Sequence, residues 1–115
     1  TDNVYSKHVV HCINYIYDHL HEKITVADAA YEAGISEGHL SRLFKKETGM
    51  SFNEYVMRKK TETARNMIDY SGYSLSQISN ILAFGSQSYF VKVFKKYEGV
   101  TPGKYQSTHL PSAFI

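Results

Sequence analysis

One stretch of this chain occurs nearly twice, fifty residues apart, and this repeat limits the possible folds more than any other feature. Residues 36–55 align with residues 86–105 without a gap. The alignment pairs Ser36 with Ser86, Leu40 with Phe90, Arg42 with Lys92, Phe44 with Phe94, Lys45-Lys46 with Lys95-Lys96, Gly49 with Gly99, Ser51 with Thr101 and Tyr55 with Tyr105. A short amphipathic segment precedes each copy, so the repeating unit is a helix, a tight turn and a basic helix. The repeat predicts two similar helical lobes.

Helical periodicity dominates the chain, and no hairpin or alternating strand pattern occurs. N-cap residues precede most of the predicted helices: Thr25, Ser36, Ser51, Ser74, Ser86 and Thr101. The sequence therefore predicts an all-α fold of about seven helices that form two helix-turn-helix lobes. Lobe one covers about residues 5–50, a long central helix covers about 52–70, and lobe two covers about 74–106. The bipartite domain is thus residues 1–106, with a loose tail at 107–115.

Composition excludes several classes of protein. At 115 residues with 43% hydrophobic residues, the chain can form one small domain or two small lobes around a core. No apolar run approaches the length of about 18 residues that a membrane span needs. The single cysteine, Cys12, cannot form an internal disulfide, which fits a reducing cytoplasm. The chain begins at Thr1 rather than Met, which allows it to be a piece of a longer protein.

Charge is distributed unevenly along the sequence. Residues 1–39 carry two basic and six acidic side chains, whereas residues 40–115 carry eleven basic and five acidic ones. This asymmetry concentrates positive potential on one part of the surface, as binding to a polyanion requires. From charge alone, ordinary solvated helix faces explain the pattern equally well.

Both repeats meet the sequence requirements of a helix-turn-helix, namely small residues on the first helix, a tight turn, and a second helix with one apolar and one polar face. In lobe one, small residues precede the turn Gly34-Ile35-Ser36, and they are Ala29, Ala30 and Ala33. The outward positions of the second helix are then Glu37, Gly38, Ser41, Arg42 and Lys45. In lobe two they are Gln87, Ser88, Val91, Lys92 and Lys95. The alternative is a helical bundle with two basic, solvated faces.

These outward side chains suit the major groove of DNA. Arg42 can form a bidentate contact with guanine, and Lys92 can approach the same atoms as a point charge. Gln87 has the paired donor and acceptor that match adenine, and Val91 can pack on a thymine methyl group. The residues expected to contact phosphates are Ser36, Lys45, Lys46, Ser86, Lys95 and Lys96.

The chain resembles the AraC/XylS family of transcriptional regulators over roughly residues 5–106. The match lies in Gly34-Ile35-Ser36, His39 to Lys46, Glu47-Thr48-Gly49, Tyr55, Ala64, Phe84, Ser86, Tyr89-Phe90, Phe94-Lys95-Lys96, Gly99, Thr101-Pro102 and Tyr105. The resemblance implies a bacterial, cytoplasmic regulator whose two recognition helices enter successive major grooves of an asymmetric operator in double-stranded DNA. It further implies RNA polymerase as a partner. Some members of the family stand alone and others carry an N-terminal sensor or dimerisation domain, so both arrangements stay open for this chain. The family's base-reading positions fall on Gly38, Ser41, Arg42, Gln87, Ser88, Val91 and Lys92.

Four positions depart from the family pattern. Ala83 stands where the second turn normally has glycine, and if that site needs a positive φ, alanine costs on the order of 1 kcal/mol. Lys60 replaces a usual arginine and Thr61 a usual apolar residue, which predicts weaker packing or backbone contact of the central helix. Gln106 replaces a common basic residue. None of these departures overturns the resemblance, and Ala83 bears on how lobe two docks on DNA.

Other functions are less well supported. His8, His11 and Cys12 share one helical face, but no further ligand occurs at a metal-binding spacing, so we expect neither a metal nor another cofactor. The chain has no phosphate loop, nucleophile elbow or paired carboxylates in an apolar setting, so we expect no enzyme. Two rivals stay open: a helical protein-interaction module that docks on the transcription machinery, and a metal-dependent catalyst that uses His8 and His11.

Overall fold

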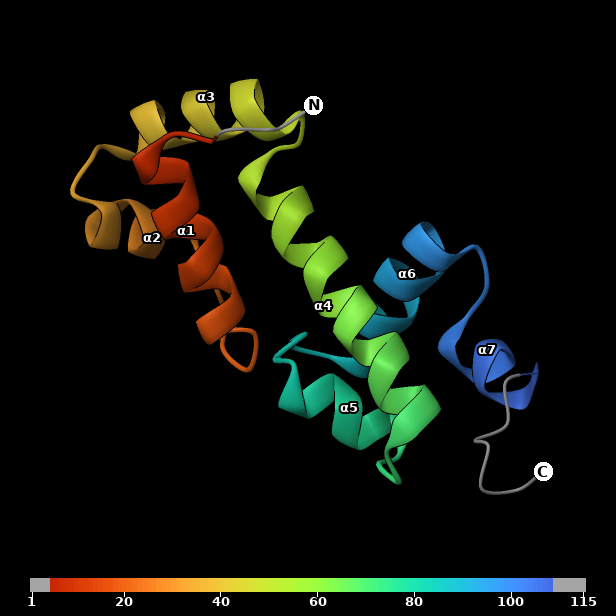
Figure 1. Cartoon of the computed structure of the whole chain (residues 1–115). Coiled ribbons are helices and arrows are strands. Elements are labelled where there is room, and N and C mark those ends of the chain that lie inside the picture. Colours follow the sequence, from red (N-terminus) through yellow and green to blue (C-terminus); the bar gives the residue numbers. More distant parts are fainter. Residues whose placement is uncertain (1–4, 109–115) are drawn as a thin grey trace. The chain divides into compact units, whose positions relative to one another are not determined.

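A computed structural model describes residues 5–108, which form seven α-helices and no strand (Figure 1). The predicted all-α class is confirmed. The helices are α1 (Lys7–Asp18), α2 (Val26–Ala33), α3 (Glu37–Thr48), α4 (Phe52–Tyr70), α5 (Leu75–Ile81), α6 (Gln87–Glu98) and α7 (Pro102–Thr108). None of the helices in residues 5–108 is long and apolar enough to cross a membrane.

Contacts divide the chain into two units, and the boundary falls inside α4. The first unit contains the residues up to Leu20 together with Ile24–Val56, and the second unit contains His21–Lys23 together with the residues from Met57 onward. The segment His21–Lys23 lies in the connection between α1 and α2 but belongs to the second unit by its contacts. The chain therefore contributes to the second unit twice.

Side-chain caps fix the helix starts as the sequence predicts. Hydroxyl oxygens of Thr25, Ser36 and Ser86 each accept a hydrogen bond from the backbone N–H three residues later. Ser74 and Gln77 form a complete capping box at the start of α5, in which each side chain bonds the backbone of the other residue.

Side-chain hydrogen bonds occur at the ends of the first and last helices. The first helix ends at Asp18, where Nδ1–H of His19 donates to the carbonyl of Tyr15 at 2.7 Å while the backbone N–H of His19 bonds the carbonyl of Ile16. The last helix continues to Thr108, where the sequence predicted a loose tail from residue 107. Hydroxyl groups of Ser107 and Thr108 donate to the carbonyl of Lys104 and extend this final turn. The rest of the predicted tail, residues 109–115, lies outside the described residues.

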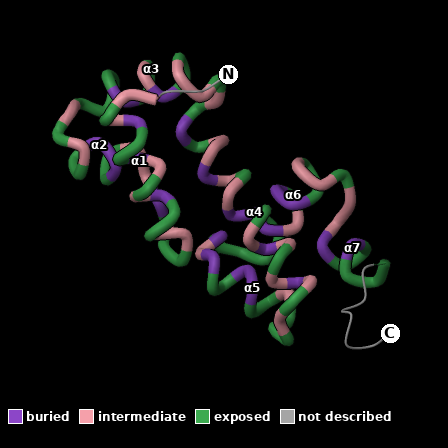
Figure 2. The backbone as a smooth tube through the Cα atoms, viewed as in Figure 1, coloured by how far each residue is buried: buried purple, intermediate pink, exposed green. Residues whose placement is uncertain are grey.

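The core of the first unit forms where α1, α2 and α3 face each other, as the buried segments in Figure 2 show. Phe44 is fully buried, and its ring meets Phe52 and Tyr55 edge-on at centroid distances of 5.5 and 5.2 Å. The other buried apolar residues are small or aliphatic: Val9, Cys12, Ile16, Ile24, Ala29, Ala30, Leu40 and Val56. This packing leaves the opposite face of α3 exposed.

The core of the second unit repeats this arrangement with larger aromatic residues. Phe94 is fully buried and meets Phe90 and Tyr105 edge-on at 5.9 and 5.7 Å. Tyr105 is the repeat partner of Tyr55, so the same phenylalanine–tyrosine contact holds each copy. The remaining buried apolar residues are Ala64, Ile68, Ile78, Leu82, Phe84 and Val93.

Candidate nucleic-acid interface

In the first unit, the outer face of α3 presents the polar groups that the sequence predicted. Leu40 and Phe44 are fully buried, which fixes the rotation of the helix about its axis. As a result, every predicted outward residue of this helix is exposed: Glu37, Gly38, Ser41, Arg42 and Lys45. Lys46 is exposed as well, and both lysines lie in the last turn, where the helix dipole favours positive charge.

Gly38 and Arg42 are adjacent on this face, one helical turn apart. A Cβ atom added at Gly38 would lie 3.3 Å from Nη1 of Arg42, whose guanidinium group thus lies over the space that a side chain would fill. Gly38 therefore offers no side-chain group of its own, and its effect is to leave room for Arg42. That Arg42 reads bases stays a prediction.

In the second unit, α6 presents a similar face with one difference. Phe90, Val93 and Phe94 are buried, and exposed polar residues lie opposite: Gln87, Ser88, Lys92, Lys95 and Lys96. Val91, which the sequence predicted to be exposed, is half-buried. Part of its side chain therefore belongs to the packing of this unit, and only the remaining surface is open to a ligand.

Ser36 and Ser86 occupy the starts of the two helices. Their hydroxyl oxygens accept hydrogen bonds from the backbone N–H groups of His39 and Tyr89, at 3.1 and 3.0 Å. Capping therefore uses the oxygen lone pairs, and the hydroxyl proton is the group that could donate to a phosphate. Both serines are exposed.

The turns before α3 and α6 use the same hydrogen bonds, but the second turn is one residue longer. In the first turn, Gly34 N–H donates to Tyr31 and Ile35 N–H to Ala30. In the second, Ala83 N–H donates to Asn80 and Phe84 N–H to Ser79, in the same pattern. Corresponding residues of the two turns are 49 positions apart in the sequence, whereas corresponding residues of the two helices that follow are 50 positions apart. The extra residue is Gly85, at φ +93°.

Ala83 adopts the left-handed conformation that the sequence analysis considered. Its φ is +53°, against +73° for Gly34 at the matching place in the first turn. The predicted condition is therefore met, and Ala83 carries a backbone strain that Gly34 avoids. Two contacts support the strained turn: the ring of Phe84 packs on Phe90 at 4.9 Å, and the hydroxyl of Ser79 donates to the carbonyl of Ser86 at 3.3 Å.

A cationic cluster at the end of α6 was not foreseen from the sequence. The guanidinium carbon of Arg58, on α4, lies 4.8 Å from the ring centroid of Tyr97, and Nζ of Lys96 lies 5.4 Å from the same centroid. Both distances fall within the range of cation–π attraction. Arg58 is exposed, so this cluster adds positive surface beside the basic residues of α6. Arg58 and Lys96 are 38 positions apart in the sequence, so no sequence motif indicates this cluster.

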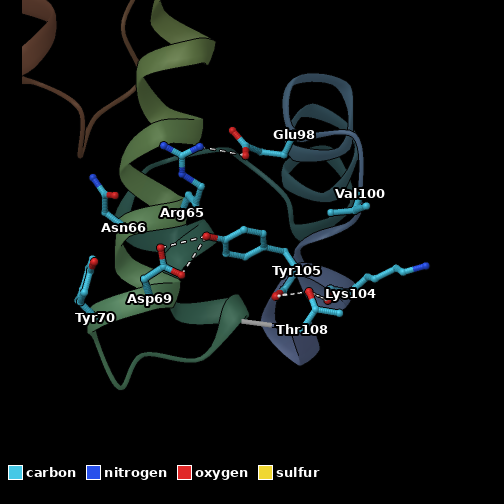
Figure 3. A pocket seen from close by; sticks show the side chains of 9 residues that line it. All are labelled: Arg65, Asn66, Asp69, Tyr70, Glu98, Val100, Lys104, Tyr105 and Thr108. Carbon is cyan, nitrogen blue, oxygen red and sulfur yellow. Dashed lines mark hydrogen bonds and ion pairs between the residues drawn. The ribbon is translucent and has the colours of Figure 1, made fainter. Parts of the chain in front are cut away.

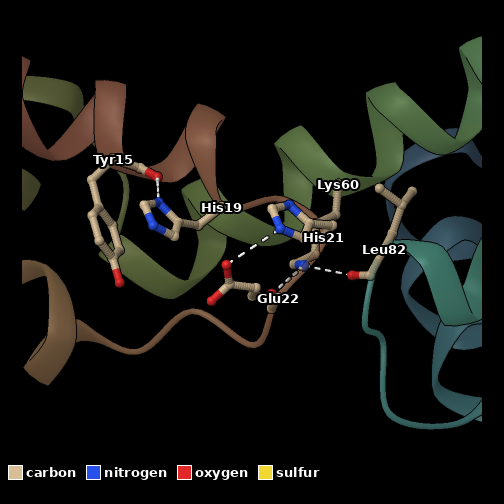
Figure 4. A network of polar contacts seen from close by, with 6 residues as sticks. All are labelled: Tyr15, His19, His21, Glu22, Lys60 and Leu82. Carbon is tan, nitrogen blue, oxygen red and sulfur yellow. Dashed lines mark hydrogen bonds and ion pairs between the residues drawn. The ribbon is translucent and has the colours of Figure 1, made fainter.

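Lys60 is the most unusual charged residue of the second unit. Only 1% of its surface is exposed, and its Nζ donates to the carbonyl of Glu22 at 2.8 Å and to that of Leu82 at 2.5 Å (Figure 4). Burial lowers the pKa of Lys60 from 10.5 to about 8, and the nearby negative charge of Glu22 partly opposes this shift. Its neighbour Thr61 is equally buried and donates to the carbonyl of Met57 at 2.8 Å. Both departures from the family pattern therefore have their polar atoms bonded.

A polar groove of about 790 Å³ lies between α4, the end of α6 and α7 (Figure 3). Arg65 forms an ion pair with Glu98 at 3.2 Å, and the hydroxyl of Tyr105 donates to both carboxylate oxygens of Asp69 at 2.9 and 3.0 Å. Burial, followed by the hydrogen bond to Asp69, raises the pKa of Tyr105 to about 12. These charged groups bond each other across the groove, so their evident role is to hold α4, α6 and α7 together.

The candidate metal ligands of α1 do not converge. Cys12 is fully buried, and burial raises the pKa of its thiol, whereas His11 is exposed. The ring of His8 meets that of His39 at 6.2 Å. Within residues 5–108, no group of three or more His, Cys, Asp and Glu side chains is arranged to hold a metal ion.

Comparison with known proteins gives a consistent result. A family profile described as a helix-turn-helix domain matches residues 29–108. The probable transcriptional regulator LumQ of Photobacterium leiognathi is 36% identical over 93 residues, which are 81% of this chain but only 38% of LumQ. The chain thus spans well under half the length of that relative.

Solved structures share the fold over nearly the whole chain. The C-terminal domain of AraT, a response regulator from Geobacillus stearothermophilus, superposes with a TM-score of 0.90 at 28% identity, covering 96% of this chain and 92% of that domain. The DNA-binding domain of AdpA, a global transcriptional factor whose structure was solved in complex with a target DNA, superposes with a TM-score of 0.84 at 22% identity. That match covers 90% of this chain and 93% of the AdpA domain. At that identity, the AdpA match concerns the fold alone.

Proposed function

This chain belongs to the AraC/XylS family of transcriptional regulators and is an AraC-type helix-turn-helix domain, and on that basis we propose that α3 and α6 read two unlike half-sites of one asymmetric operator. The observation that carries the proposal is the doubled arrangement: each unit buries one face of a basic helix and exposes the other. Two different readers on one chain need neither a palindrome nor a dimer.

Base reading is assigned to the exposed side chains near the start and middle of each helix. In α3, Arg42 contacts guanine through two hydrogen bonds, while Ser41 and the bare backbone at Gly38 allow close approach. In α6, the residues proposed to read bases are Gln87, Ser88, Val91 and Lys92. Because Val91 is half-buried, its proposed contact with a thymine methyl group involves only the edge of the side chain.

Affinity is assigned mainly to phosphate contacts, which carry no sequence information. The groups proposed for these contacts are the serine hydroxyls at the helix starts and the lysines at the helix ends: Ser36, Lys45, Lys46, Ser86, Lys95 and Lys96. All six are exposed. Displacement of counterions by these lysines predicts that binding weakens steeply as salt concentration rises.

The rival function, docking on another protein, has less support. The outer faces of α3 and α6 are polar and basic rather than apolar, whereas protein interfaces have cores depleted of charge. The chain belongs to a helix-turn-helix family and its relatives include a probable transcriptional regulator, which favours DNA as the ligand. The family is one of transcription regulators and not of enzymes.

Further partners follow from the proposed role. A regulator bound at a promoter acts through the transcription machinery, so RNA polymerase is the proposed protein partner. Since the chain spans 38% of LumQ, we propose that a sensor or dimerisation domain precedes it in the full protein. Binding to bacterial chromosomal DNA would keep such a protein in the cytoplasm.

Selection of the chain against a random duplex library at about physiological salt tests this function. Two unlike short motifs with centres about 10 to 10.5 base pairs apart are expected if both helices read successive turns of the major groove. One motif alone would mean that a single unit reads DNA, and substitution of Arg42 or Lys92 would identify it. A library without enrichment would refute the proposal and favour protein docking.

A further inference from the structure

Lys60 connects two segments that are distant in sequence. Its Nζ bonds the carbonyl of Glu22, in the connection between α1 and α2, and the carbonyl of Leu82, at the end of α5 (Figure 4). Lysine is almost never fully buried unless its charge is paired or hydrogen-bonded. Burial of this side chain to 1% exposure is therefore a specific arrangement and not an incidental surface contact.

The bond to Leu82 acts on the C-cap residue of α5, the first residue after the helix. The last four carbonyls of a helix lack donors within the helix itself. In α5, backbone N–H groups in the turn serve Ser79 and Asn80, whereas the carbonyl of Leu82 receives the ammonium group of Lys60. A positive charge at a helix C-terminus also interacts favourably with the helix dipole.

The position of Leu82 makes this bond important for the turn that follows. Leu82 directly precedes Ala83, which has a φ of +53°. The peptide group between these two residues is the one whose carbonyl Lys60 holds, so the bond limits rotation at the strained position. The first unit has glycine at the matching position, Gly34, where a positive φ involves no steric strain.

The second partner ties the same turn to the segment His21–Lys23. The carboxylate of Glu22 lies near Lys60 and is paired with Nε2 of His21 at 3.3 Å. Lys60 thus holds the α5 end against a segment that lies outside the helices of the second unit. Without the two donated hydrogen bonds, two carbonyls would need other partners.

We propose that Lys60 is a positioning residue for DNA reading by the second unit, because it fixes the turn from which α6 starts. This inference rests on the proposed function of α6 as a base-reading helix. Lys60 itself is buried and does not contact DNA. Its loss should therefore affect the half-site read by α6 and spare the half-site read by α3.

The test compares two ratios on the full chain, with the operator obtained by selection. The first ratio is the affinity for the intact operator divided by the affinity for an operator whose α3 half-site is scrambled. The second ratio is the affinity for the intact operator divided by the affinity for an operator whose α6 half-site is scrambled. Each mismatched base pair costs about 5-fold to 150-fold in affinity, so both ratios should exceed about 10 in the wild type. Lys60→Met removes the donors at similar volume, and it should lower the second ratio to below about 3 while the first stays within about threefold of wild type.

Thr61→Val provides a matched control. Thr61 is as buried as Lys60 and adjacent to it, but its hydroxyl bonds the carbonyl of Met57 within α4. This variant should keep both ratios. An equal loss of the second ratio in Thr61→Val and Lys60→Met would attribute the effect to general destabilisation and overturn the proposal.

The remaining outcomes are also decisive. A folded Lys60→Met chain that keeps its second ratio, or that loses both ratios equally, overturns the proposal. If Lys60→Met does not fold, Lys60→Arg decides, because guanidinium retains the donors: a folded Lys60→Arg chain must keep the second ratio. A wild-type chain with both ratios near 1 would instead refute the proposed function, which is distinguishable from a selective loss.

Discussion

Replacing Ala83 with glycine should stabilise the protein, although it removes a side chain. A non-glycine residue in the left-handed region costs about 1 to 2 kcal/mol. Glycine makes the unfolded chain more flexible, which lowers the free energy of unfolding by about 0.4 to 1 kcal/mol. Loss of the half-buried methyl group lowers it by a few tenths of a kcal/mol more. At the middle of these ranges the free energy of unfolding should rise by about 0.5 kcal/mol, and at their favourable end by about 1.3 kcal/mol.

The first turn offers the inverse experiment. Gly34 has a φ of +73°, and a Cβ atom placed there would have no heavy atom within 4 Å. Gly34→Ala therefore introduces backbone strain without a clash. Because alanine also makes the unfolded chain less flexible, the free energy of unfolding should fall by about 0.5 to 1 kcal/mol. Because both turns use the same hydrogen bonds, the two substitutions differ mainly in the direction of the backbone effect.

Urea unfolding followed by circular dichroism measures both changes, and an unchanged dependence on urea would show that the unfolded state is comparable. In thermal unfolding, Ala83→Gly should raise Tm by about 2 to 6 °C. A midpoint for Ala83→Gly that is equal to or below that of wild type, alongside a destabilised Gly34→Ala, would refute the reasoning. It would mean that the turn at Ala83 carries no strain that glycine can relieve.

Three further predictions concern contacts with DNA, the stability of α3 and the titration of Lys60. Arg42→Ala should cost about 1 to 3 kcal/mol of binding free energy on the selected operator and relax one base preference. Lys46→Ala should weaken binding to all sequences alike and reduce the slope of affinity against salt by about 1. If Arg42→Ala also weakened binding to all sequences alike, Arg42 would be a phosphate contact. Gly38→Ala should raise the free energy of unfolding by about 0.5 to 1 kcal/mol, because glycine is unfavourable within helices and only the mobile end of Arg42 must shift; a lower urea midpoint would contradict this. Lys60 has a folded pKa of about 8 against 10.5 when unfolded, so between these values the unfolded chain binds more protons and stability rises with pH. Relative to Lys60→Met, wild type should gain about 2 kcal/mol from pH 7 to 9.5, and a constant difference would argue against the lowered pKa.

Local features of the fold were predictable from sequence because their causes are local. Ser36 and Ser86 are capping residues followed by amphipathic helices, and each caps the helix that follows it. Gly49 and Gly99 end those helices in the left-handed conformation. The burial of apolar positions then fixed the exposed faces of α3 and α6, with the partial exception of Val91.

Features that depend on distant residues were not predictable in the same way. An ungapped shift of fifty residues aligned the helices well, and it concealed the extra Gly85 in the second turn. The role of Lys60 was misjudged for another reason: its partners are backbone carbonyls of Glu22 and Leu82, which leave no mark on the residue types at those positions. The Arg58–Tyr97 contact likewise joins residues from separate helices.

The division of the chain into units has a consequence for the order of folding. The first unit uses residues up to Val56, so all its sequence is available before the C-terminal half has been synthesised. The second unit needs His21–Lys23, and the bond from Lys60 to Glu22 closes a loop of 38 residues. Closing such a loop is entropically costlier than joining α5 to α6, which are neighbours in sequence. The contact with Glu22 should therefore form late, as the step that completes the second unit after its local helix pairing.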